Sequence, residues 1–467
     1  MTNLKGCYLL ALLFFCSLMA TAQAPERPNF IILLADDLGY GDLSCTGSTQ
    51  IQTPNIDRIA RQGVTFENGY VSAPVCSPSR AGLLTGRNQV AFGHDNNIDY
   101  NQPGFDPHFL GLPVTEKTIA DYLHELGYLN ALIGKWHLGE ASHFHPLKRG
   151  FHRFWGFTNG GHDYLKTKAG DTGYQRPIES SYPADTSISY LTDDIGRECV
   201  RVIEETNGLP FFLMASFNAP HTPLQALPKD LELFKAIADE DRRTYAAMVH
   251  RLDQNVGQIL KVLEKKGISD QTVVVFLSDN GGPVRNNASV NAPFYGQKGT
   301  LFEGGIHVPF FILWPGKIRP GTSFKHPVLS LDILPTFLSA AGGTPDPEAP
   351  ADGVDLMPYL NGQKTGRPHD EMKWRFTIGA AIRVRDYKLI RLPDRLPMLF
   401  DLEQDPSEQQ ELSGAAPEET IRLLKKLGEW DISLPHPLFL EGARWKAHNL
   451  RRYDMSYDIE QPKGSND

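Results

Sequence analysis

Residues 29–39 read Asn-Phe-Ile-Ile-Leu-Leu-Ala-Asp-Asp-Leu-Gly, an apolar run that ends in the adjacent acids Asp36 and Asp37. A short, continuous run of this kind is typical of a strand that is buried on both faces, as in a parallel sheet. Open α/β sheets bind ligands at the carboxyl ends of such strands. The two acids are therefore candidates for a binding site, although adjacent acids can also do no more than cap a turn.

Further apolar runs alternate with amphipathic segments along most of the chain. The predicted strands share a dense apolar composition and cover residues 128–133, 211–217, 272–277 and 308–314. The predicted helices lie between them, at residues 54–63, 115–126, 190–205, 243–265 and 331–341. This alternation predicts an α/β fold, with a large, doubly wound and mostly parallel sheet flanked by helices. Residues 146–164 lack clean periodicity and are expected to form a long loop.

The pattern changes near residue 370. Short runs at 375–383, 387–392 and 397–402 are separated by turn residues, which predicts a smaller antiparallel sheet, and a helix is expected at 416–430. We expect three parts in the chain. They are a signal peptide at residues 1–24, a catalytic domain at 25–370 and a smaller C-terminal α+β subdomain at 371–467.

The composition is ordinary for a globular protein, with 41% hydrophobic and 22% charged residues among 467. The formal net charge is -9 and there is no basic run. Nucleic-acid binding is therefore not expected, and any site for an anion must be a local pocket.

The first 24 residues have the pattern of a secretory signal peptide. Lys5 precedes an apolar centre at 8–18, and Ala22-Gln23-Ala24 offers a small-x-small cleavage site. The centre is too short for a comfortable membrane span. Cys16 allows a lipoprotein alternative, but the residues before it are bulky. We expect an exported protein, periplasmic or secreted.

The predicted mature chain keeps Cys45, Cys76 and Cys199, a poor framework for disulfides. Whether Cys45 and Cys199 pair is open at this stage. Cys76 lies in residues 74–87, which read Pro-Val-Cys-Ser-Pro-Ser-Arg-Ala-Gly-Leu-Leu-Thr-Gly-Arg. This stretch predicts a helix that begins near Cys76, where free backbone N–H groups and Arg80 would favour an anion. A lone cysteine near a helix start is most often a small buried hydrophobe.

Other candidate residues also follow predicted strands. Lys135 and His137 follow one strand, His221 follows another, and Asp279 and Asn280 follow a third, with Lys298 soon after. Each has a structural alternative, such as a turn or a core histidine. In a doubly wound sheet, however, these strand ends converge on one crevice.

The chemistry of these candidates is that of a metal-assisted reaction on an anion. The acids and Asn280 offer only oxygen ligands, which favours Ca²⁺ or Mg²⁺ over Zn²⁺. Histidine titrates near neutral pH and suits proton transfer.

The motif Cys76-x-Pro78-Ser79-Arg80, followed by Leu84-Thr85-Gly86-Arg87, resembles the signature of the type I, formylglycine-dependent sulfatases of the alkaline-phosphatase superfamily. The resemblance covers roughly residues 27–410. It implies that Cys76 is oxidised to formylglycine by a maturation enzyme, and that a hydroxyl of the formylglycine hydrate attacks the sulfur of a sulfate ester. It also implies a Ca²⁺ ion, with Mg²⁺ as the second choice, held by Asp36, Asp37, Asp279, Asn280 and the modified Cys76.

The same resemblance implies roles for the basic residues. Arg80 and Lys135 would steady the formylglycine, and Lys298 would bind the sulfate. His221 would act as the general acid for the leaving alcohol, and His137 would help to expel sulfate. Two readings from other classes stay open, a phosphodiesterase or phosphonate monoester hydrolase of the same superfamily and a non-catalytic binder of sulfated glycans.

Choice of substrate must come from loops around a sulfate site, because the ester group itself is common to all substrates. Two loops carry polar and aromatic groups that suit a sugar, which favours a sulfated polysaccharide or oligosaccharide. The candidate substrate-binding residues are His94, Asp95 and Asn96 in one loop and His162 and Tyr164 in the other. Taken singly, these residues could also form turns or belong to the core.

Overall fold

The fold is described from a computed structural model, which covers residues 27–99, 106–166, 173–377 and 379–462. The predicted signal peptide lies outside the described residues, as do Cys7 and Cys16. The described thiols of Cys45, Cys76 and Cys199 are all free, so Cys45 and Cys199 do not pair. Within the same residues no helix combines the length and apolar character needed to cross a membrane.

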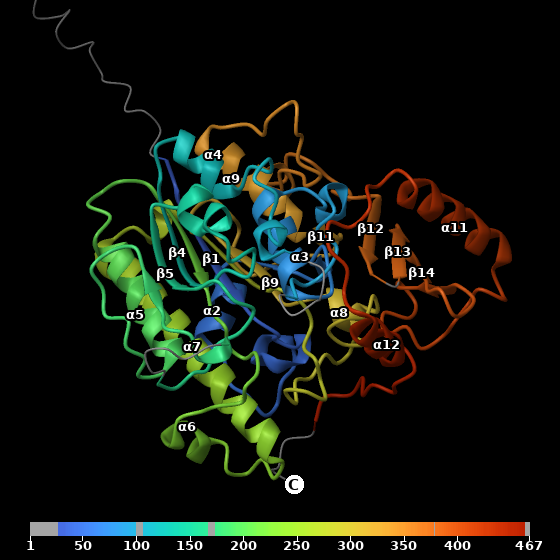
Figure 1. The fold of residues 1–467 in the computed structure, drawn as a ribbon, viewed down its shortest axis with the longest axis horizontal. Helices are drawn as coiled ribbons and strands as arrows, with labels where there is room; N and C mark the ends of the chain where they lie inside the picture. The colour runs from blue at the N-terminus through green and yellow to red at the C-terminus, as the bar shows by residue number, and fades with distance from the viewer. Residues whose placement is uncertain (1–26, 100–105, 167–172, 378, 463–467) are drawn as a thin grey trace, which may run out of the picture.

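A large sheet forms the centre of the molecule (Figure 1). Among the described residues it has nine strands in the order β10-β2-β9-β8-β1-β7-β4-β5-β6. In that order the strands are Thr322–Phe324, Val64–Phe66, Phe310–Leu313, Thr272–Ser278, Asn29–Ala35, Phe211–Ser216, Leu129–Lys135, Arg153–Phe157 and Glu179–Ser180. The central strand β1 pairs in parallel with both β7 and β8, whereas β9 and β6 pair antiparallel with their neighbours. This confirms the predicted fold class.

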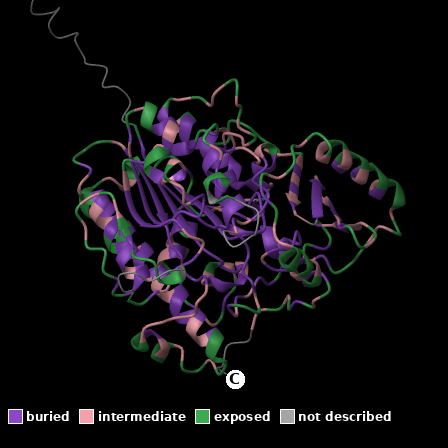
Figure 2. Cartoon of the chain, viewed as in Figure 1, coloured by how far each residue is buried: buried purple, intermediate pink, exposed green. Residues whose placement is uncertain are grey.

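Helices cover both faces of this sheet because β1 alternates its apolar side chains between them. Ile31 and Leu33 pack in one core with α2 (Pro54–Gln62), α5 (Leu191–Glu204) and α7 (Glu240–Lys266). Phe30, Ile32 and Leu34 pack in the other core with α3 (Cys76–Thr85), α4 (Ile119–Glu125) and α9 (Ile333–Ala341). The strands are therefore buried between two layers (Figure 2).

The expected long loop at 146–164 is wrong in one part, because it contains strand β5. β5 pairs in parallel with β4, and its Trp155 is a fully buried core residue. The apolar pattern of β5 is interrupted by Gly156. A side chain cannot fit at this position, since a Cβ would lie 2.0 Å from the carbonyl oxygen of Gly134. The close approach of the two strands requires glycine here, and glycine weakens the strand signal in the sequence.

A second sheet, antiparallel and four-stranded in the described residues, lies at one end of the molecule (Figure 1). Its strands are β12 (Glu371–Phe376), β13 (Gly379–Val384), β14 (Tyr387–Arg391) and β15 (Met398–Asp401). The single run expected at 375–383 is divided between β12 and β13, and their end residues Phe376 and Gly379 pair with each other. Helix α11 (Pro417–Asp431) packs on this sheet, and α12 (Ala443–Arg452) follows. The division into domains near residue 370 stays a prediction.

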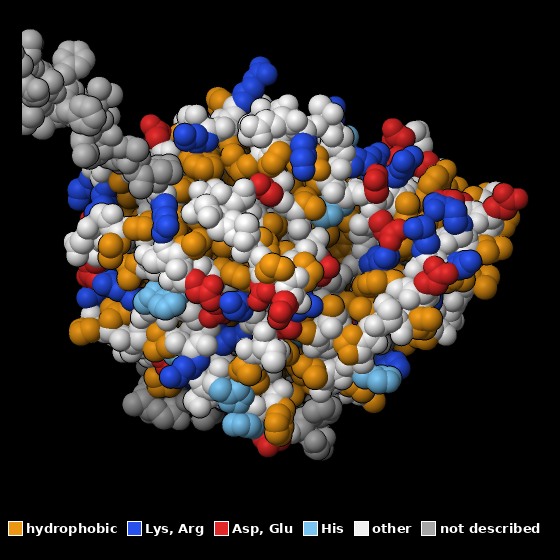
Figure 3. Space-filling view, turned by 90° about the horizontal axis from the view of Figure 1, so that it is seen from above, with side chains coloured by type: hydrophobic (Ala, Val, Ile, Leu, Met, Phe, Trp, Pro, Cys, Tyr) orange, Lys and Arg blue, Asp and Glu red, His pale blue; other side chains and the backbone are white. Residues whose placement is uncertain are grey.

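The remaining elements are short. Those made of strand or α-helix are β3 (Gly69–Tyr70), α6 (Pro228–Leu233), α8 (Glu303–Ile306), β11 (Val328–Leu329) and α10 (Met357–Leu360). On the face seen in Figure 3, acidic and basic side chains are interspersed rather than gathered by sign. This face therefore offers no patch of one charge to an anion.

His369, just before β12, joins the C-terminal sheet to the main body. Its Nε2 lies 2.8 Å from Oδ1 of Asp332. Burial opposes the charged imidazole, but the charge and hydrogen bond of Asp332 outweigh burial and raise the pKa of His369 above 6.5. The ion pair therefore stabilises the fold fully below about pH 6.5, and this contribution is lost as the pH rises through the raised pKa.

His369→Gln should accordingly lower the free energy of unfolding by about 1–2 kcal/mol at pH 6 and by less at pH 9. Urea unfolding at both pH values measures the difference, with the exposed His436→Gln as the matched control. A deficit that is equal at the two pH values would contradict the assignment.

Candidate active site

Acidic and amide side chains meet where the neighbouring strands β1 and β8 end. Asp36 and Asp37 follow β1, and Asp279 and Asn280 follow β8. The backbone N–H of Asp37 donates to Asp279 Oδ1 at 3.3 Å, and Asn280 Nδ2 donates to Asp37 Oδ1 at 2.7 Å. Asp37 has a φ of 65°, an unusual conformation for a residue other than glycine. All four are buried, which places a dense oxygen cluster inside the protein.

Cys76 is the first residue of α3, as the motif predicts, and its thiol faces this cluster. Its Sγ lies 3.5 Å from Asp36 Oδ1 and 3.1 Å from Lys298 Nζ. The thiol is 1% exposed. Burial raises the pKa of Cys76 to about 12, although nearby lysines oppose this. An unmodified Cys76 would therefore be a neutral thiol at neutral pH, which is a poor nucleophile.

Three cationic side chains surround the acids and are paired with them. Arg80 Nε donates to Asp279 Oδ2 at 2.8 Å, Lys135 Nζ to Asp36 Oδ2 at 2.6 Å, and Lys298 Nζ to Asp37 Oδ1 at 2.7 Å. Burial of so many charges is costly, and such clusters are typical of functional sites.

The pKa values of two of these carboxyls move in opposite directions. Burial opposes the charged form of Asp37, but Lys298 outweighs it and holds the pKa of Asp37 well below its usual range. Burial together with the charge of Asp36 raises the pKa of Asp279 to about 6. The two acids therefore have different proton affinities within one cluster.

Two histidines complete the cluster. The Nδ1 of His221 contacts the carbonyl oxygen of Thr222 at 2.6 Å, which leaves Nε2 directed at Asp37 Oδ2, 3.6 Å away. Burial lowers the pKa of His221 to about 3, and the charge of Asp37 opposes the shift. Burial and the charge of Lys135 lower the pKa of His137 well below 6.5. Burial therefore disfavours the charged form of both imidazoles.

The oxygen donors of the cluster, those of Asp36, Asp37 and Asn280, suit a hard divalent cation. Ligand atoms of Asp36, Asp37, Cys76 and His221 all lie within 4.8 Å of one another. In the described part of the chain, Asn280 Oδ1 is a buried acceptor without a hydrogen-bond partner. An unpaired buried oxygen beside carboxylates is what a coordinated cation would satisfy. The family resemblance implies Asp36, Asp37, Asp279, Asn280 and Cys76 as ligands and His221 as a general acid, and these roles stay predictions.

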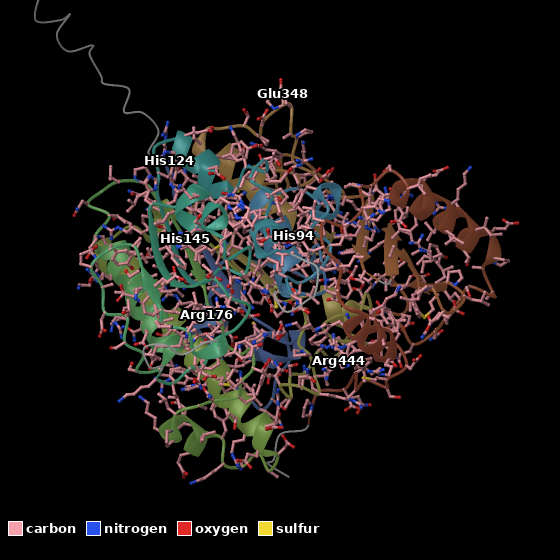
Figure 4. The ribbon with its side chains drawn as sticks, viewed as in Figure 1. His94, His124, His145, Arg176, Glu348 and Arg444 are labelled. Carbon is pink, nitrogen blue, oxygen red and sulfur yellow. The ribbon has the colours of Figure 1, made fainter. Side chains whose placement is uncertain are left out.

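The first of the two substrate loops differs from the expectation, because His94, Asp95 and Asn96 are fully buried. His94 Nε2 lies 2.7 Å from Ser77 Oγ, beside α3 near the middle of the molecule (Figure 4). Asp95 pairs with Arg375, and Asn96 donates to the carbonyl of Phe439. His94 therefore contacts the first turn of α3, whereas Asp95 contacts β12 and Asn96 contacts the chain at Phe439.

The second loop shows the same difference. His162 contacts two backbone carbonyls through its ring nitrogens, and it is 1% exposed. The hydroxyl of the buried Tyr164 donates to the carbonyl oxygens of Asn218 and His221, which fixes the turn that carries His221. Neither side chain presents a polar group to solvent.

Some supporting residues carry no signal in the sequence. Asn97 Oδ1 accepts from the backbone N–H of Ser77 at 2.9 Å, and Ser216 Oγ accepts from Arg80 Nη1 at 2.7 Å. Such polar residues are common in loops and strand ends. Only the fold brings them beside Cys76 and Arg80.

Known families and proteins match this chain over most of its length. A model of the sulfatase family matches residues 28–343, and a model described as N-sulphoglucosamine sulphohydrolase, C-terminal, matches residues 294–430. N-acetylgalactosamine-6-sulfatase of Mus musculus is 36% identical over 368 residues, which are 75% of this chain and 69% of the relative. The Homo sapiens protein of the same name is 31% identical and covers 86% of this chain and 84% of its own.

The solved structures agree with the family matches. Ps i-CgsB is similar with a TM-score of 0.84 and 34% identity, over 92% of this chain and 98% of that one. Its complex with k-i-k-neocarrahexaose is similar with a TM-score of 0.83 and 34% identity, over the same shares of the two chains.

Proposed function

The chain belongs to the sulfatase family of sulfuric ester hydrolases, and we propose that it removes sulfate esters from a sulfated carbohydrate through a formylglycine at Cys76. The observation that carries this proposal is the position of Cys76 Sγ at the head of α3, 3.1 Å from Lys298 and 3.5 Å from Asp36. The carbohydrate class is supported by the names of the relatives, N-acetylgalactosamine-6-sulfatases, and by the oligosaccharide bound to Ps i-CgsB.

The proposal includes a cation, a maturation partner and a compartment. Asp36, Asp37, Asp279 and Asn280, together with modified Cys76, would hold Ca²⁺, with Mg²⁺ as the second choice. Ligand atoms of Asp36, Asp37 and Cys76 already lie within 4.8 Å of one another. When bound, the cation would supply a Lewis acid next to the sulfate. A formylglycine-generating enzyme would modify Cys76 during export to the periplasm or the medium.

The chain's own residues suit binding and proton transfer. The ammonium group of Lys298 and the guanidinium group of Arg80 would neutralise sulfate oxygens in a buried site, where charge pairing is strong. Lys135 would steady residue 76 through Asp36. His137, buried near the same cations, would assist the release of sulfate.

His221 is the proposed general acid, acting through Nε2 because Nδ1 is engaged with Thr222. A bound sulfate ester places negative charge beside this imidazole and opposes the effect of burial on its pKa. His221→Ala should then lower kcat/KM on a carbohydrate sulfate by about 10²–10³-fold. The loss on an activated aryl sulfate, whose leaving group needs no proton, should be at least about tenfold smaller. Equal losses on both substrates would make His221 a binding residue.

A substrate panel tests the function as a whole. Matured protein is incubated with k-i-k-neocarrahexaose, N-acetylgalactosamine 6-sulfate, a phosphodiester and a phosphonate monoester, and released sulfate is measured by ion chromatography. We expect sulfate from at least one carbohydrate, and only weak hydrolysis of the phosphorus esters. Efficient hydrolysis of a phosphorus ester without sulfate release would replace the proposal with the phosphodiesterase or phosphonate hydrolase reading. Binding of the glycans without any turnover would favour a non-catalytic binder.

A further inference from the structure

The loop that carries Lys298 is held in place by the last part of the described chain. Arg452 in α12 donates from Nη1 to the backbone carbonyl of Lys298 at 2.8 Å. In the same segment, the hydroxyl of Tyr453 accepts from the N–H of Leu301 at 2.7 Å. Tyr457 accepts from the side chain of Gln297 at 2.9 Å. This segment lies beyond both family-model matches, which end at residues 343 and 430.

A chain of hydrogen bonds within the C-terminal segment holds the side chain of Arg452 in place. Its Nη1 also donates to Asn449 Oδ1 at 3.0 Å, and Asn449 donates from Nδ2 to Glu441 Oε2 at 2.7 Å. Arg452 is 7% exposed, whereas Arg451 beside it in α12 is exposed. Arg444, labelled in Figure 4, marks the first turn of this helix.

Arg452 packs closely against the backbone of the loop at Gly299. Gly299 has a φ of +83°, and a Cβ there would lie 2.0 Å from Arg452 Nη1. The backbone of Lys298 donates to the carbonyl of Gly282, and that of Gly299 donates to the carbonyl of Pro74. Arg452 supplies the contact to the backbone carbonyl of Lys298.

We infer that Arg452 is a positioning residue for Lys298. A lysine side chain is long and flexible, so the place of its ammonium group depends on where its backbone is held. The Lys298 ammonium group lies 3.1 Å from Cys76 Sγ and 2.7 Å from Asp37 Oδ1. Arg452 therefore sets the position of the charge that meets the sulfate. This inference rests on the proposed function for its effect on turnover, but not for its effect on sulfate binding.

Variants of α12 test the inference in the full chain. Arg452→Met removes the donor, Arg452→Lys keeps one donor, and the exposed Arg451→Met is the matched control for charge. The affinity of each protein for inorganic sulfate is measured by titration calorimetry. The dissociation constant should be about tenfold larger for Arg452→Met than for the other variants and the wild type. kcat/KM on an aryl sulfate should fall about 30–100-fold in Arg452→Met and recover to within about fivefold of the wild type in Arg452→Lys.

Combination with Lys298→Ala separates positioning from a general structural role. If Arg452 acts through Lys298, Arg452→Met should cause little further loss of sulfate affinity or turnover in the Lys298→Ala background. An equal loss in both backgrounds, or equal effects of Arg452→Met and Arg451→Met, would overturn the inference. If Arg452→Met does not fold, Tyr457→Phe takes its place. We expect this variant to lose about threefold or more in sulfate affinity. An unchanged affinity would overturn the inference. A wild type that binds sulfate but hydrolyses no sulfate ester would refute the proposed function alone.

Discussion

Cys76→Ser is expected to lower kcat/KM on every sulfate ester by at least about 10⁴-fold. Serine keeps the size of the side chain and its place at the head of α3, where Asp36 and Lys298 contact the present thiol. It offers only a single hydroxyl, however, and it is not the thiol that the proposed maturation enzyme oxidises. Cys76→Ala should lose as much, because neither variant carries the proposed nucleophile.

The controls for this prediction separate chemistry from folding. Cys45 is exposed and lies away from the cluster, so Cys45→Ser should retain the activity of the wild type. Thermal unfolding of the Cys76 variants should stay close to that of the wild type, because a buried thiol is replaced by a group of equal or smaller size. A Cys76→Ser protein that keeps a tenth or more of the wild-type activity would contradict the assignment of the nucleophile.

Removal of the cation is expected to abolish turnover, and Ca²⁺ is expected to restore it better than Mg²⁺. The site would bind sulfate poorly without the cation, because the carboxylates of Asp36 and Asp37 would repel the anion. Asp37→Asn keeps the shape of the side chain but removes its charge, and it should lower kcat/KM by about 10³-fold or more and weaken cation binding.

Elemental analysis of the chelated and the reloaded protein measures how much cation each contains, and the activity of the same samples is compared with it. Asp163→Asn, in the glycine-rich loop and outside the cluster, is the matched control and should leave cation content unchanged. Full activity in a preparation that contains no divalent cation would refute the metal site.

The strand ends could be predicted from the sequence because buried parallel strands leave a plain signal. β1 and β8 are continuous apolar runs, and the polar residues that follow them, Asp36 and Asp279 among them, must lie at one edge of the sheet. β5 left no such signal, since Gly156 is required by its close approach to Gly134. The expectation of a loop there followed from a local pattern that tertiary packing overrides.

The environment of the loop residues could not be predicted for a different reason. His94, Asp95 and Asn96 are polar and lie in a loop, which favours exposure. They are buried because distant segments cover them, as shown by the bond from Asn96 to Phe439, 343 residues away along the chain. The contact between Arg452 and Lys298 likewise joins segments 154 residues apart. No local pattern in a single sequence carries such pairings.

The most direct test of the central claim is the mass of the peptide that contains residue 76, measured on active protein purified after native export. The account predicts the aldehyde of formylglycine or its hydrate at this position. An unmodified Cys76 thiol in fully active protein would contradict it.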